Sequence, residues 1–342
     1  MFIQNIIKVL LRQKKMPSKI QFCENIPADK LLHHNKAKYK LQGKGLIVSI
    51  LINVYFFGFF AEVLRRNWEY VLMVPGWFHG CFTAMFIHSA MFLLANSFCY
   101  YISKKKWKIF EDERISPNVL WPWEEKNPKI WDNMKKKSLY VLLHHHFFLT
   151  PLFSIADYFF MSGTCFRFES ETLPSTFELI WQFAIFMLFD DFFFTIGHMI
   201  LHIPWLYPKI HKLHHEHYNP VAFSAEYDHW FEYSLGLIST GLLPRLMGRR
   251  VHFMTMIMWI FLRSLELQED HCGYEFSWSP FRLIPFSGSA SYHNYHHTHN
   301  SGNYGTFFTF WDSFMGTNKP FYDHLDKLEL DRLKESYKVK NE

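Results

Sequence analysis

Cysteine is scarce in this 342-residue chain, and its five cysteines follow no recognised spacing. Because there is no CxxC pair, the sequence indicates neither a secreted disulfide framework nor a cysteine-based zinc finger. The GxGxxG turn of dinucleotide-binding domains and the CxxCH sequence that attaches haem are also missing. A redox enzyme built on this chain would therefore take its electrons from another protein.

The zinc-protease signature HExxH is missing too, although the chain is rich in histidine. His215 is followed by Glu216, but Asn219 occupies the position of the second histidine. Internal repeats and low-complexity tracts are absent as well. These absences direct attention to the two features that the chain has in excess, which are apolar runs and histidine clusters.

Apolar residues are concentrated in four long runs, although the mean hydropathy of the chain is only −0.09. Each run approaches the ~20 residues that a helix needs to cross a hydrocarbon core. The sequence therefore predicts an all-α, polytopic membrane helical bundle with about four spans. Buried helices of a soluble α-protein stay open as an alternative, because the runs contain polar residues such as Glu62 and His88. The runs cover residues 46–64, 80–101, 139–161 and 177–197.

Positive charge in the loops predicts how these spans are oriented. Residues 1–45 and 102–138 carry ten Lys plus Arg each, whereas residues 65–79 carry two and residues 162–176 carry one. Because cytoplasmic loops carry the excess of Lys and Arg, both termini are expected on the cytosolic side. The pI near 8.8 is then explained by basic loops facing anionic lipid, without a nucleic-acid partner.

Histidine is unusually dense between Gly197 and Asn300, where thirteen of the 21 histidines lie. Residues three and four apart share one face of a helix, so each histidine cluster can point its imidazoles in one direction. Eight imidazoles come from three clusters, and His271 adds a ninth. The clusters are His198-x-x-x-His202, His211-x-x-His214-His215 and His293-x-x-His296-His297.

Nine clustered imidazoles predict a site with two metal ions. A structural zinc ion needs only four ligands, so nine would supply two ions with four or five nitrogens each and leave a position open for water or oxygen. Imidazole binds zinc, copper, iron and nickel, so the ligand type does not choose the metal. A site at the mouth of a membrane bundle favours a hydrophobic substrate and oxygen chemistry over peptide hydrolysis.

The residues from about 179 to 317 resemble a known family. The chain resembles the fatty acid hydroxylase/sterol desaturase superfamily of membrane di-metal oxidases, and within it the 4-methylsterol monooxygenases. The matching segments are Asp190-Asp191, HMILH at 198–202, IHKLHHEHYNP at 210–220, AEYDHWFE at 225–232, HCGYEFSWSPFRLIPF at 271–286, and HNYHH with SGNYGTFFTFWDSFMGT within 293–317.

The resemblance implies a set of metal ligands and supporting residues. Glu275 stands where related hydroxylases have a further histidine, so it is a candidate ligand. Asp191 is expected to accept an imidazole N–H and so fix the tautomer of a ligand, and His229 is expected beside the ligands or facing the substrate. Departures from the family pattern at Met199 and Ile196 concern the substrate more than catalysis. The implied ligands are His198, His202, His211, His214, His215, His271, His293, His296 and His297.

Other histidines are left out of the predicted site. His144, His145 and His146 are consecutive and point about 100° apart on a helix, so they cannot all face one metal ion. We expect one of them to reach the interior of the bundle. His217 and His299 lie beside the clusters but out of register, and a surface or supporting role suffices for them.

The resemblance also implies the reaction. Two iron ions, reduced by NAD(P)H through a b-type cytochrome and its reductase, would use O2 to oxidise a sterol 4-methyl group stepwise through alcohol and aldehyde to carboxylate. The partners implied are the bilayer, a sterol or other lipid substrate and the cytochrome. Alternatives are a sterol 5-desaturase, a side-chain oxidase, a fatty-acyl hydroxylase, a zinc membrane enzyme or a non-catalytic subunit of a membrane complex.

The expected organisation has four parts. A basic cytosolic segment covers residues 1–45, and the transmembrane region with its cytosolic loop at 102–138 covers residues 46–197. Residues 198–322 are expected to form the histidine-rich di-metal domain. Within that domain, two helices between residues 235 and 262 are expected to lie in or dip into the membrane surface. A charged tail forms residues 323–342.

The tail and the N-terminal segment predict different cellular addresses. Lys338 and Lys340 are the fifth and third residues from the end, which resembles the KxKxx retrieval signal of endoplasmic-reticulum membrane proteins. This signal requires a cytosolic C-terminus, as the loop charges also predict. The N-terminal segment has no acidic residue before Glu24, so a mitochondrial membrane is the alternative.

Overall fold

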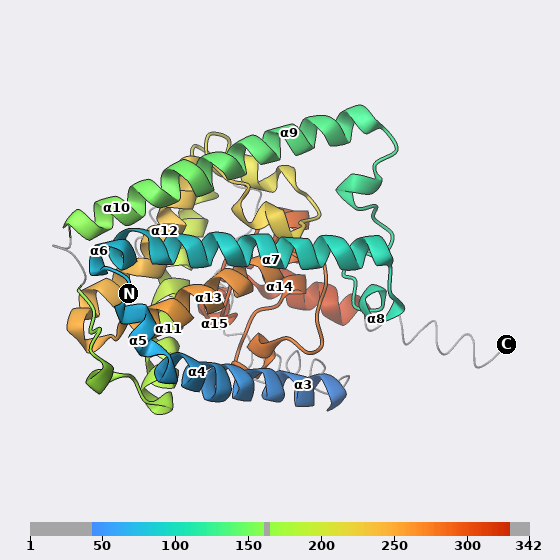
Figure 1. The fold of residues 1–342 in the computed structure, drawn as a ribbon. Coiled ribbons are helices and arrows are strands. Elements are labelled where there is room, and N and C mark those ends of the chain that lie inside the picture. Colours follow the sequence, from blue (N-terminus) through green and yellow to red (C-terminus); the bar gives the residue numbers. More distant parts are fainter. Residues whose placement is uncertain (1–42, 161–164, 329–342) are drawn as a thin grey trace.

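The structure is a bundle of helices joined by loops (Figure 1). The computed structural model describes residues 43–160 and 165–328, and it contains no β-strand within those ranges. The predicted all-α class is therefore confirmed. Most of the basic N-terminal segment, Lys338 and Lys340 lie outside the described residues.

Four helical segments are long and apolar enough to cross a membrane, as the four apolar runs predict: Gly45–Arg66, Gly76–Lys105, Pro128–Phe159 and Thr176–Leu201. The chain is thus a multi-pass membrane protein. Large apolar side chains cover the outer faces of these helices; Phe147, for example, is 77% exposed. Such surfaces are stable in lipid rather than in water.

Three of the four spans contain a wider π-helical turn. The first span consists of α3 (Gly43–Val54), η1 (Tyr55–Phe60) and α4 (Ala61–Arg66). The second consists of α6 (Gly76–Phe78), η2 (His79–Thr83) and α7 (Ala84–Lys105), and the third of α9 (Pro128–His144), η4 (His145–Leu149) and α10 (Thr150–Phe160). The fourth is the single helix α11 (Thr176–Leu201).

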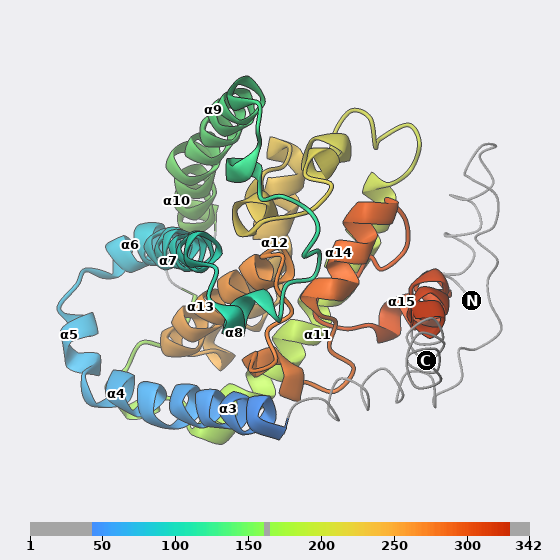
Figure 2. The same ribbon diagram turned by 90° about the vertical axis from the view of Figure 1, so that its right-hand side faces the viewer.

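Two further helices complete the bundle. These are α12 (Trp230–Met247) and α13 (Phe253–Asp270), joined by the short turn η8 (Gly248–Arg250). Helix α13 packs against α7, and Figure 2 shows it lying among α7, α12 and α11. Met254, Met258 and Trp259 on α13 are completely buried.

The enclosure of α13 differs from the expected position at the membrane surface. Two helices occupy this region, as the sequence predicts, but α13 is covered by protein on most sides. A helix that is apolar around most of its circumference is stable only when it is buried, and the first half of α13 has this character. Helix α12 instead keeps exposed apolar residues such as Leu235 and Ile238.

Short elements connect the bundle to the histidine-rich region. The turn between the first two spans holds α5 (Trp68–Leu72), and the loop between the second and third holds α8 (Lys108–Glu111) and η3 (Pro122–Glu124). The later part of the chain adds η5 (Ser170–Thr172), η6 (His211–Glu216), η7 (Ala222–Glu226), η9 (Pro280–Leu283), α14 (Ala290–His299) and α15 (Phe310–Met315).

Close packing between the second and third spans depends on a glycine. A Cβ atom at Gly80 would lie 2.1 Å from Cδ2 of Tyr158 on α10, whereas nothing lies within 4 Å of a Cβ at Gly58 in the first span. We predict that Gly80→Ala destabilises the protein by about 1–3 kcal/mol through overpacking. Gly58→Ala should be neutral or stabilising because alanine favours the helix.

Thermal unfolding of both variants in detergent micelles measures this difference. An unchanged melting temperature for Gly80→Ala would show that the two spans do not pack as described.

Candidate metal centre

Four segments that are distant in sequence bring the nine predicted histidines together. His198 lies in the last turn of α11 and His202 follows that helix directly. The turn η6 carries His211, His214 and His215, and His271 is the residue after α13. Helix α14 carries the last three histidines.

Five of the nine imidazoles form one group, which we call the first cluster. Their Nε2 atoms approach one another closely: His198 to His211 at 3.0 Å, His211 to His215 at 3.0 Å, and His215 to His296 at 3.1 Å. His202 closes the group at 3.2 Å from His296. The members are His198, His202, His211, His215 and His296.

The other four imidazoles form the second cluster, and all four are buried. The Nε2 atom of His271 lies 3.3 Å from that of His214 and 3.0 Å from that of His293. His297 completes the cluster, with its Nε2 3.2 Å from that of His293. The members are His214, His271, His293 and His297.

The spacing of these nitrogens fits metal coordination. Two nitrogens bound at right angles to one ion, each about 2.1 Å from it, are about 3.0 Å apart. Within each cluster the candidate ligand atoms all lie within 4.8 Å of one another. A neutral imidazole has one N–H, so five converging Nε2 atoms cannot all satisfy each other by hydrogen bonds. The donor set fits one ion in each cluster.

Burial keeps these imidazoles in the form that binds metal. Removal from water lowers the pKa of His215 and of His271 to about 3. Burial also lowers the pKa of His214 and His293 well below the usual range, and the neighbouring imidazoles lower it further. The rings are therefore neutral at pH 7, with a free lone pair for an ion.

The second nitrogen of several rings is held by a fixed acceptor. The Nδ1 atom of His198 donates to the Tyr304 carbonyl at 2.8 Å, and that of His296 donates to the Gly302 carbonyl at 2.6 Å. His271 donates in the same way to the Leu267 carbonyl at 3.0 Å. A proton on Nδ1 leaves the lone pair on Nε2, which points into the cluster.

Glu232 is a supporting residue that the sequence analysis missed. Its Oε1 lies 2.6 Å from Nδ1 of His211, and the carboxylate comes from the first turn of α12. The sequence feature that could have identified it is its place in the AEYDHWFE segment, because Glu232 is an acidic residue in the first turn of a largely apolar helix. A carboxylate on the outer nitrogen of a ligand orients the ring and raises its basicity.

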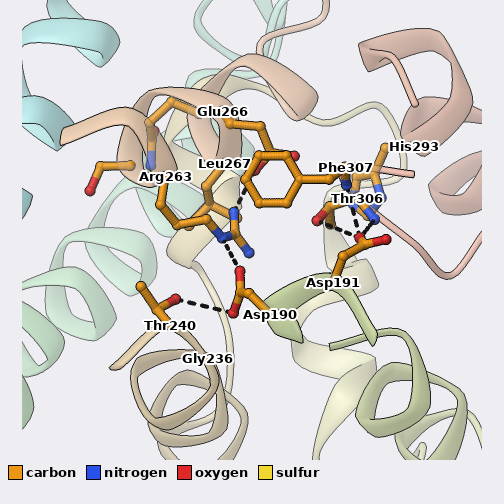
Figure 3. A network of polar contacts seen from close by, with 12 residues as sticks. Asp190, Asp191, Gly236, Thr240, Arg263, Glu266, Leu267, His293, Thr306 and Phe307 are labelled. Atoms are coloured by element: carbon orange, nitrogen blue, oxygen red, sulfur yellow. Dashed lines mark hydrogen bonds and ion pairs between the residues drawn. The ribbon is translucent and has the colours of Figure 1, made fainter. Parts of the chain in front are cut away.

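Among the described residues, Asp191 accepts backbone N–H groups and no imidazole N–H, which differs from the contact predicted for it. Its Oδ1 accepts the backbone N–H groups of Thr306 and Phe307, both at 2.9 Å, and its Oδ2 accepts that of Phe308 at 3.2 Å (Figure 3). These consecutive donors converge on one carboxylate because the loop turns around it. The same loop carries Tyr304, so Asp191 positions His198 indirectly.

The neighbouring Asp190 belongs to a separate buried ion-pair network. Arg263 on α13 donates through Nε to Asp190 at 2.7 Å and through Nη1 to Glu266 at 2.5 Å (Figure 3). Ser239 on α12 donates to the same aspartate at 2.7 Å. The network joins α11, α12 and α13, and each buried charge in it has an opposite partner, as buried charges require.

Glu275 and His229 do not belong to either cluster. Glu275 accepts from Arg282 and from the backbone N–H of Ser291, both at 2.7 Å. It thereby stabilises the N-terminus of α14, where a carboxylate is favourable. His229 precedes α12, and its Nδ1 accepts the backbone N–H of Phe231 at 3.2 Å. Both residues thus have helix-capping contacts, and a ligand role for Glu275 and a role beside the ligands or facing the substrate for His229 stay predictions.

The histidine run in the third span also differs from expectation. Both His145 and His146 are buried, although only one of the three was expected inside. Helix α10 and η4 lie against η2 and α12, so a wide arc of this span faces protein. His146 approaches His88 and Glu226, which form a further group of potential metal ligands.

A cavity of about 340 Å³ connects the two histidine clusters to the interior of the bundle. Its walls include histidines of both clusters, for example His198 and His214, and apolar side chains of α7, α10, α12 and α13. Its size is within the range of small-molecule binding sites. The clusters therefore face a largely apolar cavity.

Comparison with known proteins agrees with this helical membrane architecture and its histidine clusters. Residues 183–317 match the family model "Fatty acid hydroxylase". Methylsterol monooxygenase 2-2 of Arabidopsis thaliana is 30% identical over 239 residues, which is 68% of this chain and 83% of that protein. No solved structure matches the chain. The chain belongs to the fatty acid hydroxylase family, as the sequence motifs predict.

Other relatives match over shorter stretches. Methylsterol monooxygenase 1-1 of Arabidopsis thaliana is 38% identical over 172 residues, 49% of this chain and 56% of that protein. Very-long-chain aldehyde decarbonylase GL1-8 of Oryza sativa subsp. indica is 38% identical over 122 residues, 36% of this chain and 45% of that protein. At the level of the family, the predicted class of oxygen-dependent oxidoreductase is confirmed.

The two acidic residues Glu232 and Glu275 make a matched pair for testing the metal centre. We predict that Glu232→Gln weakens metal binding by roughly 10–100-fold, because the outer partner of His211 loses its charge. Glu275→Gln should leave metal affinity unchanged, since that carboxylate contacts α14 and Arg282.

Competition of each protein with a metal chelator, followed by elemental analysis of the protein fraction, measures both affinities. A Glu275→Gln variant that loses metal while Glu232→Gln retains it would reverse our assignment of the two carboxylates.

Proposed function

We propose that this protein is a membrane di-iron oxygenase that oxidises a sterol, with a 4-methyl group as the carbon attacked. The observation that carries the proposal is the pair of histidine clusters that face one largely apolar cavity within the helical bundle. The names of the methylsterol monooxygenases that the chain resembles support the substrate class.

The nine histidines would bind two iron ions, one in each cluster. The first cluster offers five nitrogens to one ion and the second offers four to the other. Iron bound there supplies the oxygen activation needed to attack an unactivated C–H bond. The family uses non-haem iron, and neutral imidazoles suit that metal.

The rest of the cavity would position the substrate. Apolar side chains such as Phe153, Leu237 and Ile260 line it and exclude water from the reacting carbon. A lipid-soluble molecule can bind to this apolar surface, because its transfer from the bilayer to the cavity requires little free energy. Glu232 and the Tyr304 carbonyl keep His211 and His198 in fixed orientations while the substrate binds.

Electrons would come from NAD(P)H through a b-type cytochrome and its reductase. The sequence has neither a GxGxxG turn nor a CxxCH haem attachment, so an external donor is required. Successive turnovers would then carry the methyl group through alcohol and aldehyde to carboxylate, with one O2 and two electrons used at each oxidation.

A second candidate substrate is a very-long-chain aldehyde or related acyl lipid. The 38% identity to aldehyde decarbonylase GL1-8 over 122 residues favours it. A linear chain and a sterol both present apolar surface to the cavity, so a substrate comparison decides between them.

The direct test incubates membranes containing the protein with a 4-methylsterol, a very-long-chain aldehyde, NADH, O2 and the cytochrome system, and detects products by mass spectrometry. We predict oxidised 4-methylsterol from the intact protein. His214→Ala should abolish turnover because it removes a ligand of the second cluster. His299→Ala should retain turnover, because His299 is exposed and belongs to neither cluster although it lies two residues after His297.

Two results would contradict the proposal. One is turnover of the aldehyde with no turnover of any sterol. The other is full activity of a preparation that contains zinc and no iron.

We also propose that the protein resides in the endoplasmic-reticulum membrane with both termini in the cytosol. The loop charges and the KxKxx sequence support this address. We predict that a Lys338→Ser, Lys340→Ser double variant of a tagged protein moves toward the Golgi, as fluorescence microscopy would record. Co-purification of the unaltered protein with mitochondria would favour the alternative address.

A further inference from the structure

A third group of potential metal ligands lies inside the bundle, apart from the nine histidines. It consists of His88 on α7, His146 on η4 and Glu226 at the end of η7. One atom from each residue lies within 4.8 Å of the other two. Glu226 is 1% exposed and His146 is 9% exposed, so the group is shielded from solvent.

The atoms that face one another in this group are one carboxylate oxygen and two imidazole nitrogens, in ion-pair contact. Oε2 of Glu226 lies 3.2 Å from Nε2 of His88 and 3.0 Å from Nε2 of His146. Neither Glu226 Oε2 nor His146 Nε2 has a hydrogen-bond partner in the described part of the chain. Because these two atoms lie 3.0 Å apart without the geometry of a hydrogen bond, an ion bound between them would satisfy both.

The outer atoms of the same residues are held in the way that metal ligands are held. Nδ1 of His88 lies 3.1 Å from the Ser264 hydroxyl, and Nδ1 of His146 lies 2.9 Å from the Ser89 hydroxyl. When each Nδ1–H donates to its serine, both lone pairs point inward from Nε2. Oε1 of Glu226 accepts from Gln268 at 2.9 Å, which leaves Oε2 for the centre of the group.

The charge of Glu226 also calls for a cation. Its ion-pair contacts among the described residues are with the two histidines alone, and no Lys or Arg pairs with it. Asp228, two residues further along, is buried as well. Two neutral imidazoles and one buried carboxylate around a divalent ion would remove the unbalanced negative charge.

His88 can bind a metal ion without leaving the Tyr233 hydroxyl without a hydrogen bond. Its Nε2 lies 3.0 Å from the Tyr233 hydroxyl, but that hydroxyl also lies 2.8 Å from Oγ1 of Thr150. The tyrosine therefore keeps a hydrogen bond when the His88 lone pair turns to a metal.

We propose that His88, His146 and Glu226 form a third metal site, which binds one divalent transition-metal ion of the zinc or ferrous type. Two imidazoles and one carboxylate are a ligand set that both ions use, with coordination positions left open. His88 and Glu226 also line the cavity that the two histidine clusters face. The open positions are thus directed to the same space.

The test counts metal ions in the full-length protein purified in detergent. The protein is stripped with chelator, loaded with Zn²⁺, freed of excess metal and analysed for zinc per chain. We expect about three ions in the unaltered protein and about two in Glu226→Gln and His146→Gln, which keep side-chain volume but remove a ligand. The two ions that remain report that the histidine clusters, and hence the fold, are intact.

Two matched variants separate metal binding from hydrogen bonding. Tyr233→Phe removes a hydrogen bond to His88 but no ligand, and His144→Gln changes the neighbouring histidine of the same run. Both should keep about three ions. A count of about two ions in the unaltered protein, or an unchanged count in Glu226→Gln, would overturn the third site. Because the count involves no substrate, its outcome is independent of the proposed sterol oxidation.

Discussion

The convergence of nine buried or partly buried imidazoles is the constraint on which the rest of the structure depends. Their Nε2 atoms approach to between 3.0 and 3.3 Å, and they cannot satisfy one another. Cations at the two centres would turn this unfavourable arrangement into a favourable one.

The membrane helices supply the rigid frame for these centres. Helix α11 ends at the first cluster, and Asp190 and Asp191 fix it to α13 and to the loop before α15. Helix α13 is enclosed in the bundle and ends directly before His271 of the second cluster. A shift of either helix would move a ligand in one cluster and a wall of the cavity. Metal binding and membrane folding are therefore coupled through the same contacts.

The sequence predicts the parts of this molecule that depend on local pattern. Apolar runs identify the four spans, and histidine spacing identifies the nine residues that meet. The division into five and four was not predicted, because each cluster combines imidazoles from elements whose relative placement depends on tertiary packing. The turn η6 sends His211 and His215 to the first cluster and His214 to the second.

The supporting contacts were harder to predict because their partners are far apart in sequence. Asp191 meets backbone N–H groups 115 to 117 residues later, and His88 meets Glu226 across two different helical segments. Glu275 was assigned because it occupies the position of a further family histidine, but its carboxylate contacts Arg282 and the N-terminus of α14. Residue type and spacing give the ligands, whereas tertiary packing decides which polar groups support them.

The central claim is that each metal ion is bound mainly by histidine. X-ray absorption at the iron edge tests it most directly, measured on iron-loaded Glu226→Gln so that the proposed third site does not contribute. The account predicts two irons per chain with four to five imidazole nitrogens each, at about 2.1 Å. A coordination shell dominated by oxygen or sulfur, or a single iron per chain, would contradict it.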